Sequence, residues 1–167
     1  SGSVLIAGII EGKIEAQINL FKKIIKDDFL RQRIHDSKFE GKKNQRLSIE
    51  LIEGKTTKVI FVGLGKAETL QIDDLRKAAS ICTRQVSGYA KKLGIFFPWD
   101  AFDPSSAASA VGEAVQLSSF KDLRFKSGSQ PPDPIHELEL IGLDSKTTES
   151  AIAEINPICE GVKFARE

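Results

Sequence analysis

The sequence predicts an α/β domain in which a sheet carries helices on both faces. Short apolar runs rich in β-branched residues alternate with stretches of about 10–20 residues that have helical apolar spacing. The length of 167 residues suits one domain with a core that needs no disulfide or metal. The sequence contains 41% hydrophobic and 28% charged residues, and this composition excludes a disordered or fibrous chain. No run of about 18 apolar residues is present, so a membrane-spanning helix is not expected.

The first part of the chain is expected to form three strands and two helices. In order, we expect a strand at 4–10, a helix at 14–25, a short helix at 29–37, a half-buried strand at 47–51 and a central strand at 59–62. The last of these, Val-Ile-Phe-Val, is continuously apolar, which is typical of a strand covered on both faces. Gly63 and Gly65 follow it and are expected to end it in a tight turn, because glycine tolerates positive φ.

A long helix is expected next, starting near Asp73 and Asp74, which suit a helix start through capping and the helix dipole. Its expected apolar face consists of Leu75, Ala78, Ala79, Cys82, Val86, Tyr89, Ala90 and Leu93. A buried strand at 95–97 follows, and then a helix capped by Asp103 and Pro104 whose small side chains allow close packing on a sheet. A loop at 127–134 and a last strand at 137–140 complete the prediction.

The two ends of the chain are interpreted separately from the domain at 4–150. Residues 1–3, Ser-Gly-Ser, resemble a remnant of an expression tag and are set aside. A helix is expected over 151–167, with a kink or restart at Pro157. The apolar side chains that recur at helical spacing in this segment are Ala151, Ile152, Ile155, Ile158, Cys159, Val162 and Ala165. Because no stop signal follows, we expect the natural chain to continue; a frayed terminal helix is the alternative.

No catalytic, cofactor-binding or metal-binding residue is predicted from the side chains themselves. His35 and His136 have no partner at a metal-ligand spacing and are expected to be structural or exposed. Cys82 and Cys159 are interpreted as buried, inert thiols in a reducing, cytoplasmic setting. The closest carboxylate pairs are Asp73 with Asp74, interpreted as a helix start, and Glu137 with Glu139, interpreted as the solvent face of a strand.

The net charge of +1 is the sum of a basic first part and an acidic second part of the chain. Residues 1–99 carry 18 basic and 11 acidic side chains, whereas residues 100–167 carry 6 basic and 12 acidic ones. The basic excess is concentrated at 22–46, a stretch that could attract a phosphate backbone such as DNA, or an acidic partner. The plainer interpretation is a solvated pair of helices with mixed charges.

The segment 62–66, Val-Gly-Leu-Gly-Lys, is the one phosphate-loop lookalike. It follows a buried strand, where backbone amides can bind an anion. It lacks the Walker spacing and the third glycine of the dinucleotide fingerprint. We therefore favour a tight turn at the strand exit over a ligand site.

The stretch VIFVGLGKAETLQIDDLRKAA at 59–79 resembles the N-terminal domain of the leucyl aminopeptidase (cytosol aminopeptidase) family. Three further segments agree in order: Phe-Glu-Gly-Lys at 39–42, the stretch 111–127, and the end of the chain, Gly-Val-Lys-Phe-Ala-Arg-Glu. The resemblance covers nearly all of 4–167. Asp122 stands where the family often has an aromatic residue.

This resemblance implies a macro-domain-like fold, a mixed sheet flanked by helices on both faces. It implies that 151–167 begins a linker helix to a C-terminal catalytic domain, which holds two divalent metals, zinc or manganese, and hydrolyses N-terminal amino acids from peptides. The N-terminal domain would then serve assembly and scaffolding in a cytoplasmic homo-hexamer without contact with a membrane, and some bacterial members also bind DNA. The alternatives are a nucleotide- or ADP-ribose-binding macro module and a DNA-binding surface.

Overall fold

The computed structural model describes residues 2–21, 29–52, 54–119, 135–154 and 163–165. Within these residues the chain forms one six-stranded mixed sheet, in the order β2-β3-β1-β4-β5-β6. The strands are β1 (Gly2–Ile10), β2 (Arg46–Glu50), β3 (Lys58–Gly65), β4 (Ala90–Phe96), β5 (Glu137–Leu140) and β6 (Lys163–Ala165). Only β2 runs antiparallel to its neighbour in this sheet, and the other pairings are parallel.

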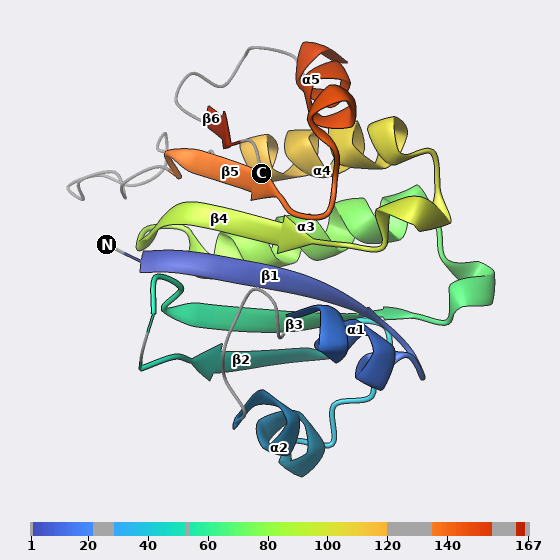
Figure 1. Ribbon diagram of the computed structural model, residues 1–167, viewed down its shortest axis with the longest axis vertical. Coiled ribbons are helices and arrows are strands. Elements are labelled where there is room, and N and C mark those ends of the chain that lie inside the picture. Colours follow the sequence, from blue (N-terminus) through green and yellow to red (C-terminus); the bar gives the residue numbers. More distant parts are fainter. Residues whose placement is uncertain (1, 22–28, 53, 120–134, 155–162, 166–167) are drawn as a thin grey trace, which may run out of the picture.

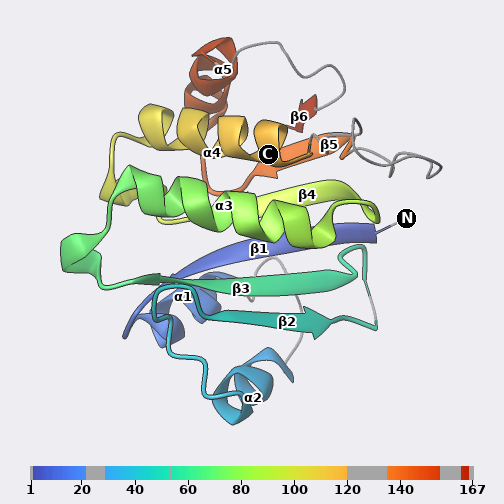
Figure 2. The same cartoon turned by 180° about the vertical axis from the view of Figure 1, so that it is seen from behind.

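Helices cover both faces of the sheet, as the sequence predicts (Figures 1 and 2). On one face lie α1 (Ile14–Phe21) and α2 (Phe29–Asp36), and on the other lie α3 (Ile72–Val86) and α4 (Pro104–Ser119), with α5 (Ser145–Glu154) beside α4. Two short 3-10 helices, η1 (Ala67–Thr69) and η2 (Trp99–Ala101), follow β3 and β4. No helix in the described part of the chain is long and apolar enough to cross a membrane.

The core is divided by the sheet into two apolar clusters. Along β1, Val4 and Ile6 belong to the cluster beneath α3 and α4, whereas Leu5 and Ile9 belong to the cluster beneath α1 and α2. This two-sided burial follows from the central place of β1, which is parallel to both β3 and β4. The small residues predicted for one face of α4 are buried, and they let α4 pack closely beside α3.

The helix expected to reach Leu93 ends earlier, so that part of the prediction is wrong. Helix α3 ends at Val86, Tyr89 lies in a turn, and β4 begins at Ala90. Gly88 has a φ of +105°, a backbone conformation that a continuing helix does not contain. Leu93 is buried because it belongs to a central strand, and its helical spacing from Val86 is coincidental.

The helix expected over 151–167 is also wrong in part. Helix α5 begins at Ser145, after Asp144, whose Oδ1 accepts a hydrogen bond of 2.6 Å from the Thr147 amide. Residues 163–165 form β6, parallel to β5, instead of a helical turn. The physical reason is the open edge of β5, whose unpaired backbone groups a short strand can satisfy.

The three residues set aside at the start of the chain are partly built into the fold. Gly2 and Ser3 belong to β1, and Gly2 pairs with Ala90 of β4. Four predicted features lie outside the described residues: positions 22–25 of the first predicted helix, the loop at 127–134, Asp122 and Cys159.

Candidate functional site

The glycine-containing segment that resembles a phosphate loop is covered by another part of the chain. Gly63 lies inside β3 and does not end it, which corrects the expectation of a turn at that residue. The loop 41–45 crosses over this end of β3: the Gly63 amide donates to the Gln45 carbonyl at 2.8 Å, and the Gly65 amide donates to the Gly41 carbonyl at 3.0 Å. A Cβ atom on Gly63 would lie 1.9 Å from the Lys42 carbonyl oxygen. Gly63 therefore permits close contact between two backbone segments.

Gly65 forms the strand-exit turn that the sequence predicts. Its φ is +83°, and its carbonyl accepts a hydrogen bond of 2.9 Å from the Glu11 amide after β1. The loop is further closed by Gln45, whose Oε1 accepts hydrogen bonds from the amides of Glu40 and Lys42 at 3.1 and 3.0 Å. Because the amides of both glycines donate within the protein, they are not directed at an anion.

Replacing Gly65 by alanine should lower the free energy of unfolding by about 1 kcal/mol, because alanine is strained at positive φ. The nearest atom to an added Cβ, the Lys43 Cβ, is 3.4 Å away, so the cost is conformational and not steric. Urea unfolding measures this cost. Gly65→Asn is the matched control and should cost less, since asparagine tolerates this backbone region better. Equal losses for the two variants would contradict the conformational explanation.

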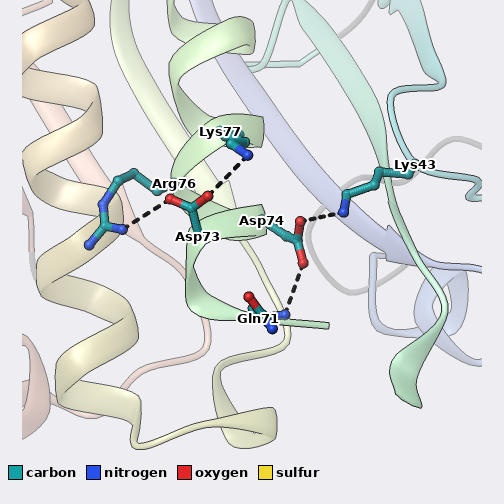
Figure 3. Close-up of polar contacts among 6 residues, drawn as sticks. All are labelled: Lys43, Gln71, Asp73, Asp74, Arg76 and Lys77. Atoms are coloured by element: carbon teal, nitrogen blue, oxygen red, sulfur yellow. Dashed lines mark hydrogen bonds and ion pairs between the residues drawn. The ribbon is translucent and has the colours of Figure 1, made fainter. Parts of the chain in front are cut away.

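Beside this loop lies a pocket of about 110 Å³ between β3 and α3. Its polar lining consists of Lys43, Asn44, Arg46, Asp74 and Lys77. Figure 3 shows the contacts of Lys43 and Asp74: the Lys43 ammonium lies 2.8 Å from an oxygen of Asp74, and the other oxygen of Asp74 accepts a hydrogen bond of 2.9 Å from the Gln71 amide. The contacts tie the loop to the first turn of α3.

Asp73 and Asp74 begin α3, as the sequence predicts, but the N-cap is Gln71. Gln71 and Asp74 close this first turn: the Asp74 carboxylate accepts a hydrogen bond of 2.9 Å from the Gln71 amide, as in a capping box, and the Asp74 amide donates to the Gln71 carbonyl at 3.0 Å. Asp73 contacts Arg76 at 3.3 Å and Lys77 at 3.1 Å. Burial raises the pKa of Asp74, but the hydrogen bonds from Lys43 and the Gln71 amide outweigh it, so the pKa is below its ordinary value.

Replacing Asp74 by asparagine should lower the free energy of unfolding at neutral pH by about 1 kcal/mol, because the Lys43 pair is lost and the capping box is weakened. The folded-state pKa of Asp74 is depressed, so its contribution is complete above the ordinary value of 3.8 and disappears as the pH falls through the folded pKa. The difference between wild type and variant should therefore shrink on acidification.

Urea unfolding at pH 7 and pH 3 measures this difference. Asp73→Asn is the control: Asp73 is half exposed, so the loss of its ion pairs should change stability less. A difference for Asp74→Asn that stays constant between the two pH values would contradict the assigned role.

The remaining titratable candidates are dispersed in the structure. His35 is exposed beside Asp36, and His136 is exposed at the start of β5. Burial raises the pKa of the Cys82 thiol to about 12, as expected for an inert cysteine. Glu137 and Glu139 both contact Lys92, at 3.3 and 3.6 Å. Among the residues that the structure describes, no three His, Cys, Asp or Glu side chains are grouped as metal ligands.

The basic stretch 22–46 contains several paired charges where the structure describes it. Arg31 contacts Glu15 at 3.5 Å and also donates to Asn19. The Lys42 ammonium lies 2.5 Å from a carboxylate oxygen of Glu40, and the hydrogen bond that Lys42 donates to Glu40 raises the lysine pKa. These contacts agree with the interpretation of a solvated surface with mixed charges.

Two aromatic side chains are buried near the place where a nucleotide would bind in such a sheet. Ligands of open α/β sheets bind outside the carboxyl ends of strands at the point where the connections change direction, here between β1 and β4. Phe97, only 1% exposed, packs there against Gly8 of β1, where a Cβ would lie 2.6 Å from the phenyl ring. Trp99 lies beside it and donates a hydrogen bond of 2.7 Å to the Ile141 carbonyl. The geometry thus gives no support to the nucleotide-binding alternative.

Sequence reasoning missed the residues that organise this region. Neither Lys43 nor Gln71 is among the predicted site residues, and the strand predicted at 95–97 includes Phe97, which follows the end of β4 at Phe96. The capping-box spacing between Gln71 and Asp74 was the available signal for one of them. The pairing of Lys43 with Asp74 joins residues 31 positions apart, and no local pattern indicates it.

Comparisons with known proteins give a consistent result. Residues 8–129 match the model of the cytosol aminopeptidase family, N-terminal domain. Proteins named probable cytosol aminopeptidase from two strains of Prochlorococcus marinus are 41% and 45% identical to this chain over 167 and 166 residues. A protein with the same name from a Synechococcus strain is 34% identical over 170 residues. The alignments include 99–100% of this chain but 34% of each relative, so the chain spans about a third of their length.

Two solved structures share the fold. A mutant of tomato leucine aminopeptidase superposes with a TM-score of 0.70 at 19% identity, covering 91% of this chain and 33% of the other. The bottromycin maturation enzyme BotP superposes with a TM-score of 0.62 at 23% identity, covering 92% of this chain and 29% of the other. These matches show the fold. In both structures, this chain corresponds to about a third of the other chain's length.

Proposed function

This chain belongs to the cytosol aminopeptidase family as its N-terminal domain, and from that premise we propose that it is the non-catalytic part of a longer leucyl aminopeptidase. The whole enzyme would hydrolyse N-terminal amino acids from peptides in the cytoplasm. The observation that carries the proposal is the coverage: relatives align with this whole chain, yet about two thirds of their length lies outside it. We assign catalysis to that remaining part.

The metal dependence is part of the same proposal. A structure of BotP is described as a complex with Mn, which supports a divalent metal such as manganese or zinc in the family. The described residues of this chain do not fit such a metal, because they contain no group of three candidate ligands. We therefore place the two metals in the catalytic part, which would use them to activate water and polarise the peptide carbonyl.

The role proposed for this domain is scaffolding. The loop over β3 is tied to α3, and Phe97 is buried against Gly8 of β1, so this end of the sheet is well suited to a structural role. We propose a macro-like domain at 4–150 that supports a homo-hexamer and is linked to its own catalytic domain through 151–167. Since β6 lies within 163–165, that connection includes a strand of the sheet and is not one continuous helix.

The enzymatic test compares this chain with the full-length protein on leucine p-nitroanilide. We expect no turnover from the chain alone with added zinc or manganese, and metal-dependent turnover from the full-length protein that a chelator removes. The reading frame of the full-length protein should also encode a second domain with Lys, Asp and Glu metal ligands. Turnover by the chain alone that a point substitution in this chain abolishes would overturn the proposal.

A further inference from the structure

The strand β2 forms one edge of the sheet, and its outer side pairs with no other strand in the described part of the chain. Its inner side is defined by two hydrogen bonds: the Gln45 carbonyl accepts from the Gly63 amide, and the Leu51 amide donates to the Thr57 carbonyl. Gln45 and Leu51 thus direct their backbone groups toward β3, as do the odd-numbered residues between them. The amides and carbonyls of Arg46, Ser48 and Glu50 point outward.

The side chains of these three residues lie on the α3 face of the sheet. The Gln85 side chain of α3 donates to the Ser48 hydroxyl at 2.9 Å and accepts from Arg46 at 3.3 Å. Glu50, whose side chain is 80% exposed, contacts Lys58 at 3.2 Å. The outer edge therefore has a cation at one end, an anion at the other and a small polar residue between them.

We propose that this edge pairs antiparallel with β2 of a second copy of the chain, about a two-fold axis at Ser48. In this register Arg46 of each copy lies opposite Glu50 of the other, and Ser48 lies opposite Ser48. All three pairs are of the hydrogen-bonded type, because the outward backbone groups of each copy face those of the other. Registers that set Arg46 against Arg46 or Glu50 against Glu50 bring like charges together, which selects against them.

The helices beside β2 contact it through side chains on its two faces. Helix α3 lies on the even-numbered face of β2, where Gln85 contacts Ser48. Helix α2 lies near the same edge in Figures 1 and 2, but Leu30 and Ile34 pack with Ile49 on the odd-numbered face. The paired edge would extend two six-stranded sheets into one. This inference depends on the sheet edge alone and does not require the proposed hexamer.

Charge reversal tests the proposed register. Sedimentation velocity over a range of concentrations should show a reversible dimer of this chain, weaker at high salt because the Arg46–Glu50 pairs are exposed. Arg46→Glu and Glu50→Arg each set like charges opposite one another twice, so each should weaken the dimer roughly tenfold or more. The double variant Arg46→Glu/Glu50→Arg restores opposite charges and should recover the dimer.

Two further variants keep the test decisive. Lys146→Glu, on the exposed start of α5, has the same change in net charge as Arg46→Glu and should leave the dimer unchanged. Ser48→Pro removes the central outward amide and should abolish the dimer, with circular dichroism confirming that the variant is folded. A wild-type chain that stays monomeric at high micromolar concentration would overturn the proposal. A dimer insensitive to both single reversals would do so as well.

Discussion

Gly63→Ala is expected to prevent the domain from folding, or to lower its free energy of unfolding by more than about 4 kcal/mol. The added methyl group would lie 1.9 Å from the Lys42 carbonyl oxygen and 2.7 Å from the Gly41 carbonyl carbon. Both are backbone atoms, so no side-chain rotation can relieve the overlap. The loop would have to move away from β3 and lose its hydrogen bonds to Gly63 and Gly65.

Urea unfolding monitored by circular dichroism, together with the soluble yield, measures this effect. Gly94→Ala is the matched control, because Gly94 also lies inside a buried strand. The nearest atom to its added Cβ is the Ile141 Cδ1 at 3.1 Å, the end of a flexible side chain, so the loss should be much smaller. Wild-type stability of Gly63→Ala would show that loop 41–45 does not cross β3 as described.

Phe97→Ala is expected to destabilise the domain by about 3–5 kcal/mol, because it removes a fully buried ring and leaves a cavity. The ring packs over Gly8 and beside Trp99, with ring centroids 5.8 Å apart. Thermal unfolding should therefore occur at a markedly lower temperature. The Trp99 fluorescence should also change, because the neighbouring Phe97 ring is lost.

A double-mutant cycle tests the contact between Phe97 and Gly8 directly. Gly8→Ala alone should be costly, since its Cβ would lie 2.6 Å from the Phe97 ring and 2.8 Å from Leu64. Combined with Phe97→Leu, which vacates part of that space, the total loss should be smaller than the sum of the single losses. Strict additivity would mean that the two residues do not share this space.

The sequence was sufficient for the class of fold because the strands and the starts of helices have local signals. The run 59–62 predicts a buried strand, and Asp103 with Pro104 predicts the start of α4, where Asp103 accepts a hydrogen bond of 3.1 Å from the Ser106 amide. The end of α3 was misplaced because Leu93 happens to continue its apolar spacing. The strand β6 was missed because a segment of three residues has too few positions to show a period.

The region around Gly63 could be recognised only in part. A glycine that ends a strand and a glycine that allows another backbone segment to pass close by have the same local sequence, so the sequence predicts one role for both Gly63 and Gly65. The crossing segment lies about twenty residues earlier, and only the folded chain brings its Lys42 carbonyl to Gly63. The burial of Phe97 over Gly8 is likewise a contact between residues 89 positions apart. Such contacts depend on topology, which periodicity does not determine.

The central position of β1 has a consequence for synthesis on the ribosome. β1 emerges well before its two neighbours in the sheet, Lys58–Gly65 and Ala90–Phe96. Parallel strands cannot pair through a short hairpin, so the nascent β1 has both hydrogen-bonding edges open during this interval. Its apolar residues Val4 to Ile10 are then available to other chains or to chaperones. Completion of the sheet around β1, and protection from aggregation, must wait until β4 has left the exit tunnel.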